Sequence, residues 1–369
     1  MSGPFVLAAG GTGGHLFPAE ALAGELVGRG RQVHLVTDSR TGFLAAQIAG
    51  VEIHTVSAGR LGGGPIRAAH GLAGLAAGTL QARRLLRRLV PAVVIGFGGY
   101  SSLPTMLAAA SLGLPTLIHE QNAVLGRANR LLAPRVARIA TGFPQTAGLR
   151  PGARAVHTGN PVRPAVLALG DAAYTPPQDD GMIELLVLGG SQGAHILAEI
   201  VPAALAMLPQ PLRRRLYVSQ QARPEDIAAV VEDYAEAEIS AEIESFFADV
   251  PQRLERAHLA ICRSGASTVA ELAAIGRPAL LIPYPYATDD HQTANARAFA
   301  MAGGGRVVQQ AGLGAEALAA EIGKLLASPP ALIEMAQRAA AFGRRGAARE
   351  LALLTLALEP SPASQERAA

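Results

Sequence analysis

The chain has 369 residues, half of them apolar, with a formal net charge of +3 and one cysteine. This length exceeds what one small core requires, so two domains are expected. The sequence has no apolar run long enough to span a bilayer and no basic N-terminal segment typical of a secretory signal, so a cytoplasmic protein is expected. Aromatic residues are scarce and tryptophan is absent, which argues against a nucleic-acid partner bound by base stacking.

The first predicted element is a buried strand at residues 5–9, followed by a glycine-rich turn and a helix over residues 17–27. The turn reads Gly-Gly-Thr-Gly-Gly-His and ends at His15. Its glycines allow the backbone to approach a ligand closely, but their spacing is not that of a dinucleotide fingerprint. A second strand, residues 33–37, ends at Asp38, which could bind the ribose of a nicotinamide cofactor. A nicotinamide-dependent oxidoreductase therefore remains a distant alternative.

Arginines crowd one predicted helix around residues 72–88, behind an apolar and glycine-rich run. They are Arg83, Arg84, Arg87 and Arg88. An apolar patch beside arginines suits the surface of an anionic membrane. A core helix with a solvated end explains the same pattern, so both interpretations stay open.

Polar residues follow the next two predicted strands of this half. A strand at residues 93–97 leads into a glycine and serine turn, and a strand at residues 115–118 leads into His-Glu-Gln-Asn, ending at Asn122. Ligands of open α/β sheets bind beyond the carboxyl ends of the strands, which is where these side chains are expected. A proline-rich and acidic stretch over residues 159–180 then indicates a linker.

Beyond this stretch the pattern of the first half returns. The segment ELLVLGGSQGAHILAE repeats the plan of FVLAAGGTGGHLFPAE, and residues 259–286 repeat that of residues 93–122. Two internal repeats in the same order predict an α/β protein of two Rossmann-like, doubly wound domains facing each other across a cleft. The expected domains are residues 1–163, completed by a C-terminal helix at 341–369, and residues 164–340.

The second half supplies two candidate anion sites. Ser191 lies in a Gly-Gly-Ser-Gln-Gly turn that can bind a diphosphate through backbone N–H groups. A strand from residue 259 leads through a small turn to a predicted helix at 266–275 and a further strand, which ends in a polar loop containing Gln292. Glu271, on that helix, either binds the diol of a ribose or is simply solvated. No cluster of histidines or carboxylates has metal-ligand spacing, so no metal or other cofactor is implied.

Several motifs together resemble the MurG family of peptidoglycan glycosyltransferases over about residues 5–300. They are GGTGGHLFPA, GFGGYSSLP, HEQN, TGNPVR, GGSQGA, CRSGASTVAEL and DDHQTANA. The resemblance implies the GT-B fold and transfer, with inversion, of N-acetylglucosamine from its UDP conjugate. The implied acceptor is undecaprenyl-diphosphate-linked N-acetylmuramyl pentapeptide at the cytoplasmic face of the membrane, to which the enzyme would attach peripherally. Another GT-B lipid glycosyltransferase, such as one acting on diacylglycerol, is the nearest alternative.

The same resemblance implies the site residues. Thr12, Gly13 and Gly14 match the loop that contacts the sugar and the lipid diphosphate. Asn122 matches a residue that contacts the donor sugar, and Gln292 matches the residue that contacts the sugar hydroxyls. Arg163 matches a residue near the diphosphate, and Ser191 matches the phosphate-binding serine. The start of the donor-binding helix is matched by Ala266, Ser267, Thr268, Val269, Ala270 and Glu271, with Glu271 on the ribose. Phe247 stands where the family reads uracil through the backbone of an isoleucine, and His291 replaces the first of two glutamines.

A general base is needed to activate the acceptor hydroxyl at C4 of the muramyl sugar. His15, at the tip of the first glycine turn, is the candidate, because imidazole titrates near neutral pH. The alternative is that His15 only binds a phosphate or caps the helix. A non-catalytic nucleotide-sugar-binding protein would keep Glu271 and Ser191 without depending on His15.

Overall fold

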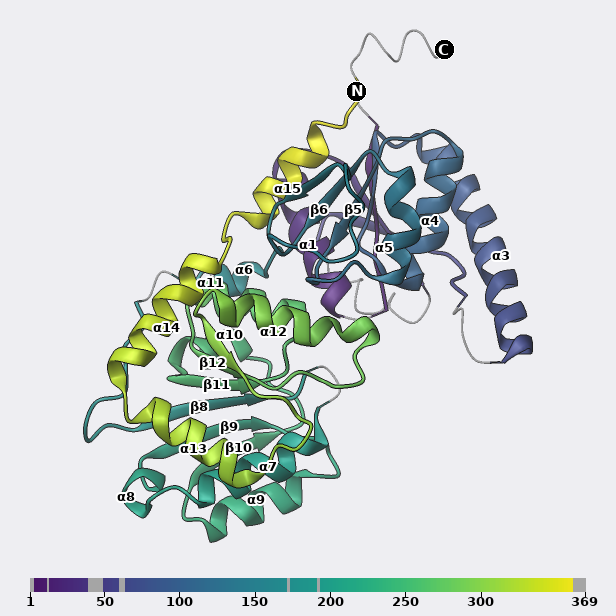
Figure 1. Ribbon diagram of the computed structural model, residues 1–369. Coiled ribbons are helices and arrows are strands. Elements are labelled where there is room, and N and C mark those ends of the chain that lie inside the picture. The colour runs from purple at the N-terminus through teal and green to yellow at the C-terminus, as the bar shows by residue number, and fades with distance from the viewer. Residues whose placement is uncertain are drawn as a thin grey trace. The chain divides into compact units, whose positions relative to one another are not determined.

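The computed structural model describes residues 3–11, 13–38, 49–59, 64–170, 173–190 and 193–360, without the side chains of residues 65–68. The chain forms two compact units (Figure 1). Unit 1 comprises Met1–Arg163 and Arg345–Ala369, and unit 2 comprises Pro164–Arg344.

Unit 1 is built on a parallel sheet of seven described strands. They are β1 Phe5–Ala8, β2 Val33–Thr37, β3 Val51–Thr55, β4 Val93–Gly96, β5 Thr116–Glu120, β6 Arg138–Thr141 and β7 Ala155–His157. Their order in the sheet is β3-β2-β1-β4-β5-β6-β7, and all the pairs are parallel. Because helices cover both faces of such a sheet, its central strands are continuous apolar runs, as in the fully buried β1 and β4.

Helices cover the two faces of this sheet with separate apolar cores. The helices and helical turns are α1 Gly13–Gly28, α3 Pro65–Leu89, α4 Gly99–Ser111, α5 Arg127–Leu132, η1 Ala133–Arg135 and α15 Ala347–Leu356. On one face α1 and α15 pack together through residues such as Leu22 and Leu351. On the other face α3 and α4 lie side by side (Figure 1), contributing Leu86 and Met106. None of the described helices is both long and apolar enough to cross a membrane.

Unit 2 repeats the plan with six described parallel strands. They are β8 Ile183–Leu188, β9 Leu216–Gln221, β10 Ser240–Glu244, β11 Leu259–Cys262, β12 Ala279–Leu281 and β13 Gly305–Val307, in the order β10-β9-β8-β11-β12-β13. The helices and helical turns are α6 Pro164–Leu167, α7 His195–Ala206, α8 Gln210–Arg213, α9 Ile227–Glu236, α10 Val250–Arg256, α11 Ala266–Ile275, η2 Thr288–Asp290, α12 His291–Met301, α13 Ala315–Leu326 and α14 Pro329–Phe342.

The internal repeat seen in the sequence is a repeat of topology. The order β3-β2-β1-β4-β5 in unit 1 corresponds strand for strand to β10-β9-β8-β11-β12 in unit 2. The predicted fold class, two Rossmann-like α/β domains, is therefore confirmed. Since the strands of each sheet are parallel, the glycine turn after its first strand and the polar loops after the next strands share one edge of that sheet.

The C-terminal helix begins later than predicted. Instead of the predicted helix beginning at residue 341, α14 ends at Phe342 and α15 starts at Ala347. Gly343, between them, has an extended backbone, and a Cβ there would lie 2.6 Å from the carbonyl oxygen of Ala273. A side chain would collide with α11 at this point, so the close approach requires glycine.

Candidate active site

In unit 1 the first glycine turn passes directly into a helix. Helix α1 begins at Gly13, four residues earlier than predicted, so Gly13, Gly14 and His15 form its first turn. The N–H groups of a first turn have no partner within the helix and can bind an anion. A Cβ on Gly13 would lie 2.9 Å from the Phe17 ring, so glycine is needed there. Thr12 lies outside the described residues.

A chain of hydrogen bonds fixes the orientation of His15. The buried His119 donates from Nε2 to the carbonyl oxygen of Gly159 at 3.1 Å, and burial lowers the pKa of His119 to about 4. The neutral ring therefore accepts at Nδ1, where the Gln121 amide nitrogen lies 3.1 Å away. This turns the Gln121 amide oxygen toward His15, whose Nδ1 lies 3.2 Å from it. His15 must donate from Nδ1, so in its neutral form the lone pair is on Nε2, as a general base requires.

Two glycines of the next turn make room for the imidazole of His15. Gly98 and Gly99 have φ angles of +84° and +71°, which disfavour other residues. A Cβ on Gly99 would lie 3.3 Å from His15 Nε2, and one on Gly98 would lie 3.5 Å from the ring. The Gly-Gly pair after β4 thus lets the α4 turn pack against the ring without a side chain in the way.

The carboxylate of Glu120 organises the loop after β5. It accepts hydrogen bonds from the backbone N–H groups of Asn122 at 3.1 Å and Gly126 at 2.9 Å, and from the Asn129 amide at 2.8 Å. The Asn122 side chain also donates to it, at 3.2 Å. Asn122 is thus held at the predicted edge of the sheet. Sequence reasoning missed the positioning roles of Glu120 and Gln121, although their place at a strand end was the available signal.

Other polar residues of unit 1 meet at this edge. The guanidinium of Arg163 lies 4.9 Å from the centre of the Phe17 ring, which brings Arg163 to helix α1. The buried Asn160 amide has no hydrogen-bond partner for its nitrogen or oxygen within the described part of the chain. Because unpaired buried amides are costly, Asn160 is a further candidate ligand group that sequence reasoning missed. Asp38 is only 3% exposed and accepts a hydrogen bond from the Ser101 hydroxyl, which favours a structural role over ribose binding.

In unit 2 the predicted helix at 266–275 is confirmed as α11. Glu271 is 7% exposed, so it is not the solvated helix glutamate of the simpler interpretation. The buried hydroxyl of Ser267, in the first turn, has no partner among the described residues. Ala266 and Val269 are buried as well. The start of α11 therefore offers backbone N–H groups and a hydroxyl without a protein acceptor, as a site for a polar ligand requires.

Gln292 is tied to the turn before α11. The structure corrects its predicted setting, because it lies in the first turn of α12 and not in a loop. Its side-chain oxygen accepts from the N–H of Tyr284 at 2.9 Å, and its carbonyl oxygen accepts from the Ser264 hydroxyl at 2.8 Å. The buried Arg263 donates to the carbonyl oxygens of Ile282 and Pro283, both at 3.0 Å. These bonds bring Gln292 close to the start of the predicted donor-binding helix.

The second glycine turn precedes α7. Gly190 and Gly193 have φ angles of +84° and +69°, and the N–H of Gly193 donates to the carbonyl oxygen of Gly190 at 3.0 Å. A Cβ on Gly189 would lie 2.5 Å from the backbone nitrogen of Ala194. Glycine is therefore required at Gly189 by the close approach of the backbone, and it is favoured at Gly190 and Gly193 by their positive φ angles. Ser191 lies outside the described residues, so its predicted contact to phosphate stays a prediction.

The side chain of Phe247 is buried, with 4% exposed, and lies beneath the guanidinium of Arg253 at 4.0 Å. Arg253 is held there by an ion pair with Glu242 at 2.7 Å. Because the ring is enclosed in this way, it is not available to stack on a base. Any contact to uracil at this position would have to come from the backbone.

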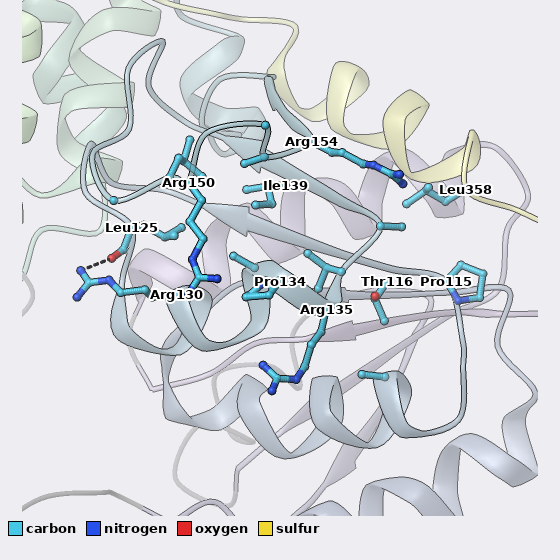
Figure 2. A pocket seen from close by; sticks show the side chains of 18 of the residues that line it. Pro115, Thr116, Leu125, Arg130, Pro134, Arg135, Ile139, Arg150, Arg154 and Leu358 are labelled. Carbon is cyan, nitrogen blue, oxygen red and sulfur yellow. Dashed lines mark hydrogen bonds between the residues drawn. The ribbon is translucent and has the colours of Figure 1, made fainter.

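Unit 1 has a pocket of about 930 Å³ that is not lined by the predicted site residues (Figure 2). Its lining includes Pro115 and Thr116 at the start of β5 and Arg154 just before β7, together with Arg130 and Arg135. It is therefore at the amino ends of the parallel strands, opposite the glycine turns. The pocket is not part of the predicted substrate site.

Each unit has a strand, a glycine turn and a helix, with polar groups at the carboxyl edge of its sheet. Two such Rossmann-like units are the architecture of GT-B glycosyltransferases. Residues 5–141 match the glycosyltransferase family 28 N-terminal domain, and residues 184–351 match the family's C-terminal domain. The chain belongs to glycosyltransferase family 28, and its predicted enzyme class is confirmed.

Relatives extend the similarity over nearly the whole chain. A protein of Rhodospirillum centenum is 54% identical, covering 99% of both chains, and one of Sinorhizobium medicae is 52% identical, covering 96% of both. Both are named UDP-N-acetylglucosamine–N-acetylmuramyl-(pentapeptide) pyrophosphoryl-undecaprenol N-acetylglucosamine transferase. MurG of Acinetobacter baumannii is 31% identical, with a TM-score of 0.79 over 96% of this chain and 99% of that one. The predicted resemblance to the MurG family is confirmed.

The fold is shared more widely than the sequence. The glycosyltransferase of kitacinnamycin is 18% identical, with a TM-score of 0.73 over 98% of this chain and all of that one. LpCGTa, solved in complex with UDP, is 16% identical, with a TM-score of 0.66. At such low identity these two structures support the GT-B fold alone.

Proposed function

We propose that the chain transfers N-acetylglucosamine from UDP-N-acetylglucosamine to the C4 hydroxyl of undecaprenyl-diphosphate-linked N-acetylmuramyl pentapeptide, forming lipid II for peptidoglycan synthesis. The observation that carries the proposal is the 54% identity over 99% of both chains with a relative named for this reaction. The site residues add a physical account of how the reaction proceeds.

His15 acts as the general base in this proposal. As the C4 oxygen attacks the anomeric carbon, Nε2 of His15 takes the hydroxyl proton, and the bond between the anomeric carbon and the UDP oxygen breaks with its electrons remaining on UDP. The hydrogen bond from Nδ1 to Gln121 keeps the ring oriented and stabilises the imidazolium that forms. Attack from the face opposite UDP inverts the anomeric centre.

Unit 2 binds the donor in this proposal. Glu271 accepts hydrogen bonds from the ribose hydroxyls, and Gln292 contacts the hydroxyls of the transferred sugar. The first turn of α11 presents backbone N–H groups to the diphosphate, whose negative charge grows as the bond breaks. Main-chain donors of this kind perform the role that a divalent ion performs in other transferases, so we propose transfer without a metal cofactor.

Helix α3 is proposed to attach unit 1 peripherally to the cytoplasmic face of an anionic membrane. Its residues Leu72 and Leu80 are 57% and 58% exposed, and Arg84, Arg87 and Arg88 are exposed further along the helix. No acidic residue occurs in α3. Apolar side chains beside cations on one exposed helix fit the interface of an anionic bilayer, and such binding weakens with added salt.

Glycines explain why α3 keeps this face outward. A Cβ on Gly78 would lie 1.8 Å from the carbonyl oxygen of Ser57, and one on Gly59 would lie 1.9 Å from the carbonyl oxygen of Gly71. The glycine side of the helix is thus pressed against the segment after β3. The opposite side, with its leucines and arginines, is left exposed.

A transfer assay tests the reaction. Radiolabelled UDP-N-acetylglucosamine is incubated with the protein and a short-chain analogue of the muramyl lipid, with lipid-free sugar and diacylglycerol as alternative acceptors. We expect label in the muramyl lipid only. Transfer to diacylglycerol would instead identify another lipid glycosyltransferase, and UDP binding without any transfer would identify a non-catalytic protein.

Vesicle sedimentation tests the membrane surface. Reversing the charges of Arg84, Arg87 and Arg88 to glutamate should strongly reduce binding to vesicles rich in anionic lipid, because each basic residue near the surface contributes about 1 kcal/mol. The matched control reverses three exposed basic residues of unit 2, Arg297, Lys324 and Arg338. Equal loss of binding in both variants would show that net charge, and not α3, directs attachment.

A further inference from the structure

Three potential metal ligands lie on the two outermost strands at one side of the unit 1 sheet. In the parallel pairing of β2 with β3, His34 is opposite Glu52, and His54 follows Glu52 by two residues. Side chains two apart on a strand share a face, so all three side chains are on the same face of the sheet. Spacing along the chain gave no sign of this cluster, because strand pairing is what brings the two segments together.

The ligand atoms are spaced as one metal ion requires. Nδ1 of His34 and Nε2 of His54 are 3.0 Å apart, and each lies 3.5 Å from a Glu52 carboxylate oxygen. All three ligand atoms are within 4.8 Å of one another. Tetrahedral zinc with bonds of about 2.0–2.1 Å has its ligand atoms about 3.3–3.4 Å apart. The observed separations bracket this value, so an ion could be bound with small movements of the side chains.

Burial and charge bear on how such an ion would bind. The His34 side chain is 2% exposed and that of His54 is 14% exposed, whereas that of Glu52 is 64% exposed. The site therefore has a rigid inner side made of imidazole and an outer side through which an ion can enter. Without an ion, one of the two facing ring nitrogens donates a hydrogen bond to the other. The positive charge of Arg88 acts on His54 and opposes a cation there, which limits the affinity.

We propose that His34 Nδ1, His54 Nε2 and the Glu52 carboxylate bind one divalent transition-metal ion, represented by Zn²⁺. Two imidazoles with one carboxylate suit zinc better than magnesium or calcium, which prefer sets of oxygen ligands. Water completes the coordination. The role is structural, because the ion joins the edge strand β3 to β2 and lies outside the residues assigned to transfer. It therefore does not depend on the proposed reaction.

Zinc titration after removal of metals with a chelator tests the proposal. Calorimetry should give one saturable site per chain, and melting temperature should rise with zinc concentration, because a ligand that binds only the folded state stabilises it. Glu52→Gln keeps the size of an exposed side chain and should weaken zinc binding by roughly tenfold or more. His54→Gln should do the same, while His70→Gln, which removes an exposed histidine of the same unit, should leave the affinity unchanged.

Two further measurements separate the site from adventitious binding. Arg88→Gln should tighten zinc binding, since it removes the opposing charge. In crystals grown with zinc, anomalous scattering should place the ion about 2.0–2.1 Å from His34 Nδ1 and His54 Nε2. No saturable binding, an affinity unaffected by both Glu52→Gln and His54→Gln, or an anomalous peak elsewhere would each overturn the proposal.

Discussion

The two units place a histidine at the start of the helix that follows their glycine turn, but the two side chains have different partners. His15 in unit 1 donates from Nδ1 to the neutral amide of Gln121. His195 in unit 2 is 54% exposed and has a carboxylate beside each ring nitrogen, Asp226 at 2.8 Å and Glu199 at 3.2 Å. Both nitrogens of His195 are therefore occupied by acids, whereas Nε2 of His15 keeps a lone pair. The same position in a repeated plan serves different chemistry because the neighbouring side chains differ.

The largest expected effect comes from removing His15. Loss of a general base typically costs roughly 100-fold to 10,000-fold in rate, so His15→Ala should lower kcat by this factor while the KM for the donor changes little. The matched control is His195→Ala, which removes the corresponding histidine of unit 2 and should affect kcat far less. Steady-state kinetics of both variants, with circular dichroism to check folding, make the comparison. Near-normal turnover by His15→Ala would leave His15 only a phosphate ligand.

The next effect tests whether unit 2 acts on binding and not on the chemical step. A hydrogen bond to a charged group contributes about 1.5–3 kcal/mol, so Glu271→Ala should raise the donor KM about tenfold to a hundredfold with a smaller change in kcat. Calorimetry should show a matching loss of affinity for UDP. Glu271→Gln retains one acceptor oxygen, so its donor KM should lie between those of the wild type and Glu271→Ala. Unchanged UDP affinity would reject the assignment to ribose.

The sequence predicts those features of the structure that depend on interactions between residues close together along the chain. The helix at 266–275 and the apolar strands were predictable because their signals are local periodicity and turn residues. The early start of α1 was missed, since its glycines have low helix propensity and only the fold places them in a first turn. The short strands β6 and β7 were also missed, because their few residues carry little pattern.

Within the site, residue types were predictable but their partners were not. The sequence indicated a base at His15, yet Gln121, which orients it, lies 106 residues away along the chain. The same holds for His34 and Glu52, which strand pairing brings opposite each other. Such contacts arise from topology, and no spacing within a motif reports them.

A third effect concerns the buried end of the chain of hydrogen bonds in unit 1. Because burial lowers the pKa of His119 from 6.5 to about 4, the unfolded state binds more protons than the folded state between these values. Stability is then full above pH 6.5 and falls as the pH decreases toward 4. From the two pKa values, this histidine alone should reduce the free energy of unfolding by about 2 kcal/mol between pH 7.5 and pH 5.

Urea unfolding of the wild type and of His119→Gln at these two pH values measures this contribution. Other histidines with lowered pKa, such as His54 and His258, act in the same direction in both proteins and cancel in the difference. The variant should therefore show the smaller loss of stability. An equal loss in the two proteins would mean that His119 has the same pKa in the folded and unfolded states, so that burial does not keep this ring neutral at pH 5.

The smallest expected effect separates orientation from stability. Gln121→Leu removes the amide oxygen that accepts the hydrogen bond from His15 Nδ1. A lost hydrogen bond of about 1 kcal/mol corresponds to a roughly fivefold decrease in kcat, with the donor KM unchanged. Gln220→Leu in unit 2 is the matched control, because Gln220 is equally buried and accepts a hydrogen bond from the Tyr234 hydroxyl. Both variants should melt at lower temperature, but at a temperature where both are folded only Gln121→Leu should turn over more slowly. If the two lose the same activity per folded molecule, the amide of Gln121 contributes packing alone, and the contrast between His15 and His195 must rest on solvent exposure instead of on a directed hydrogen bond.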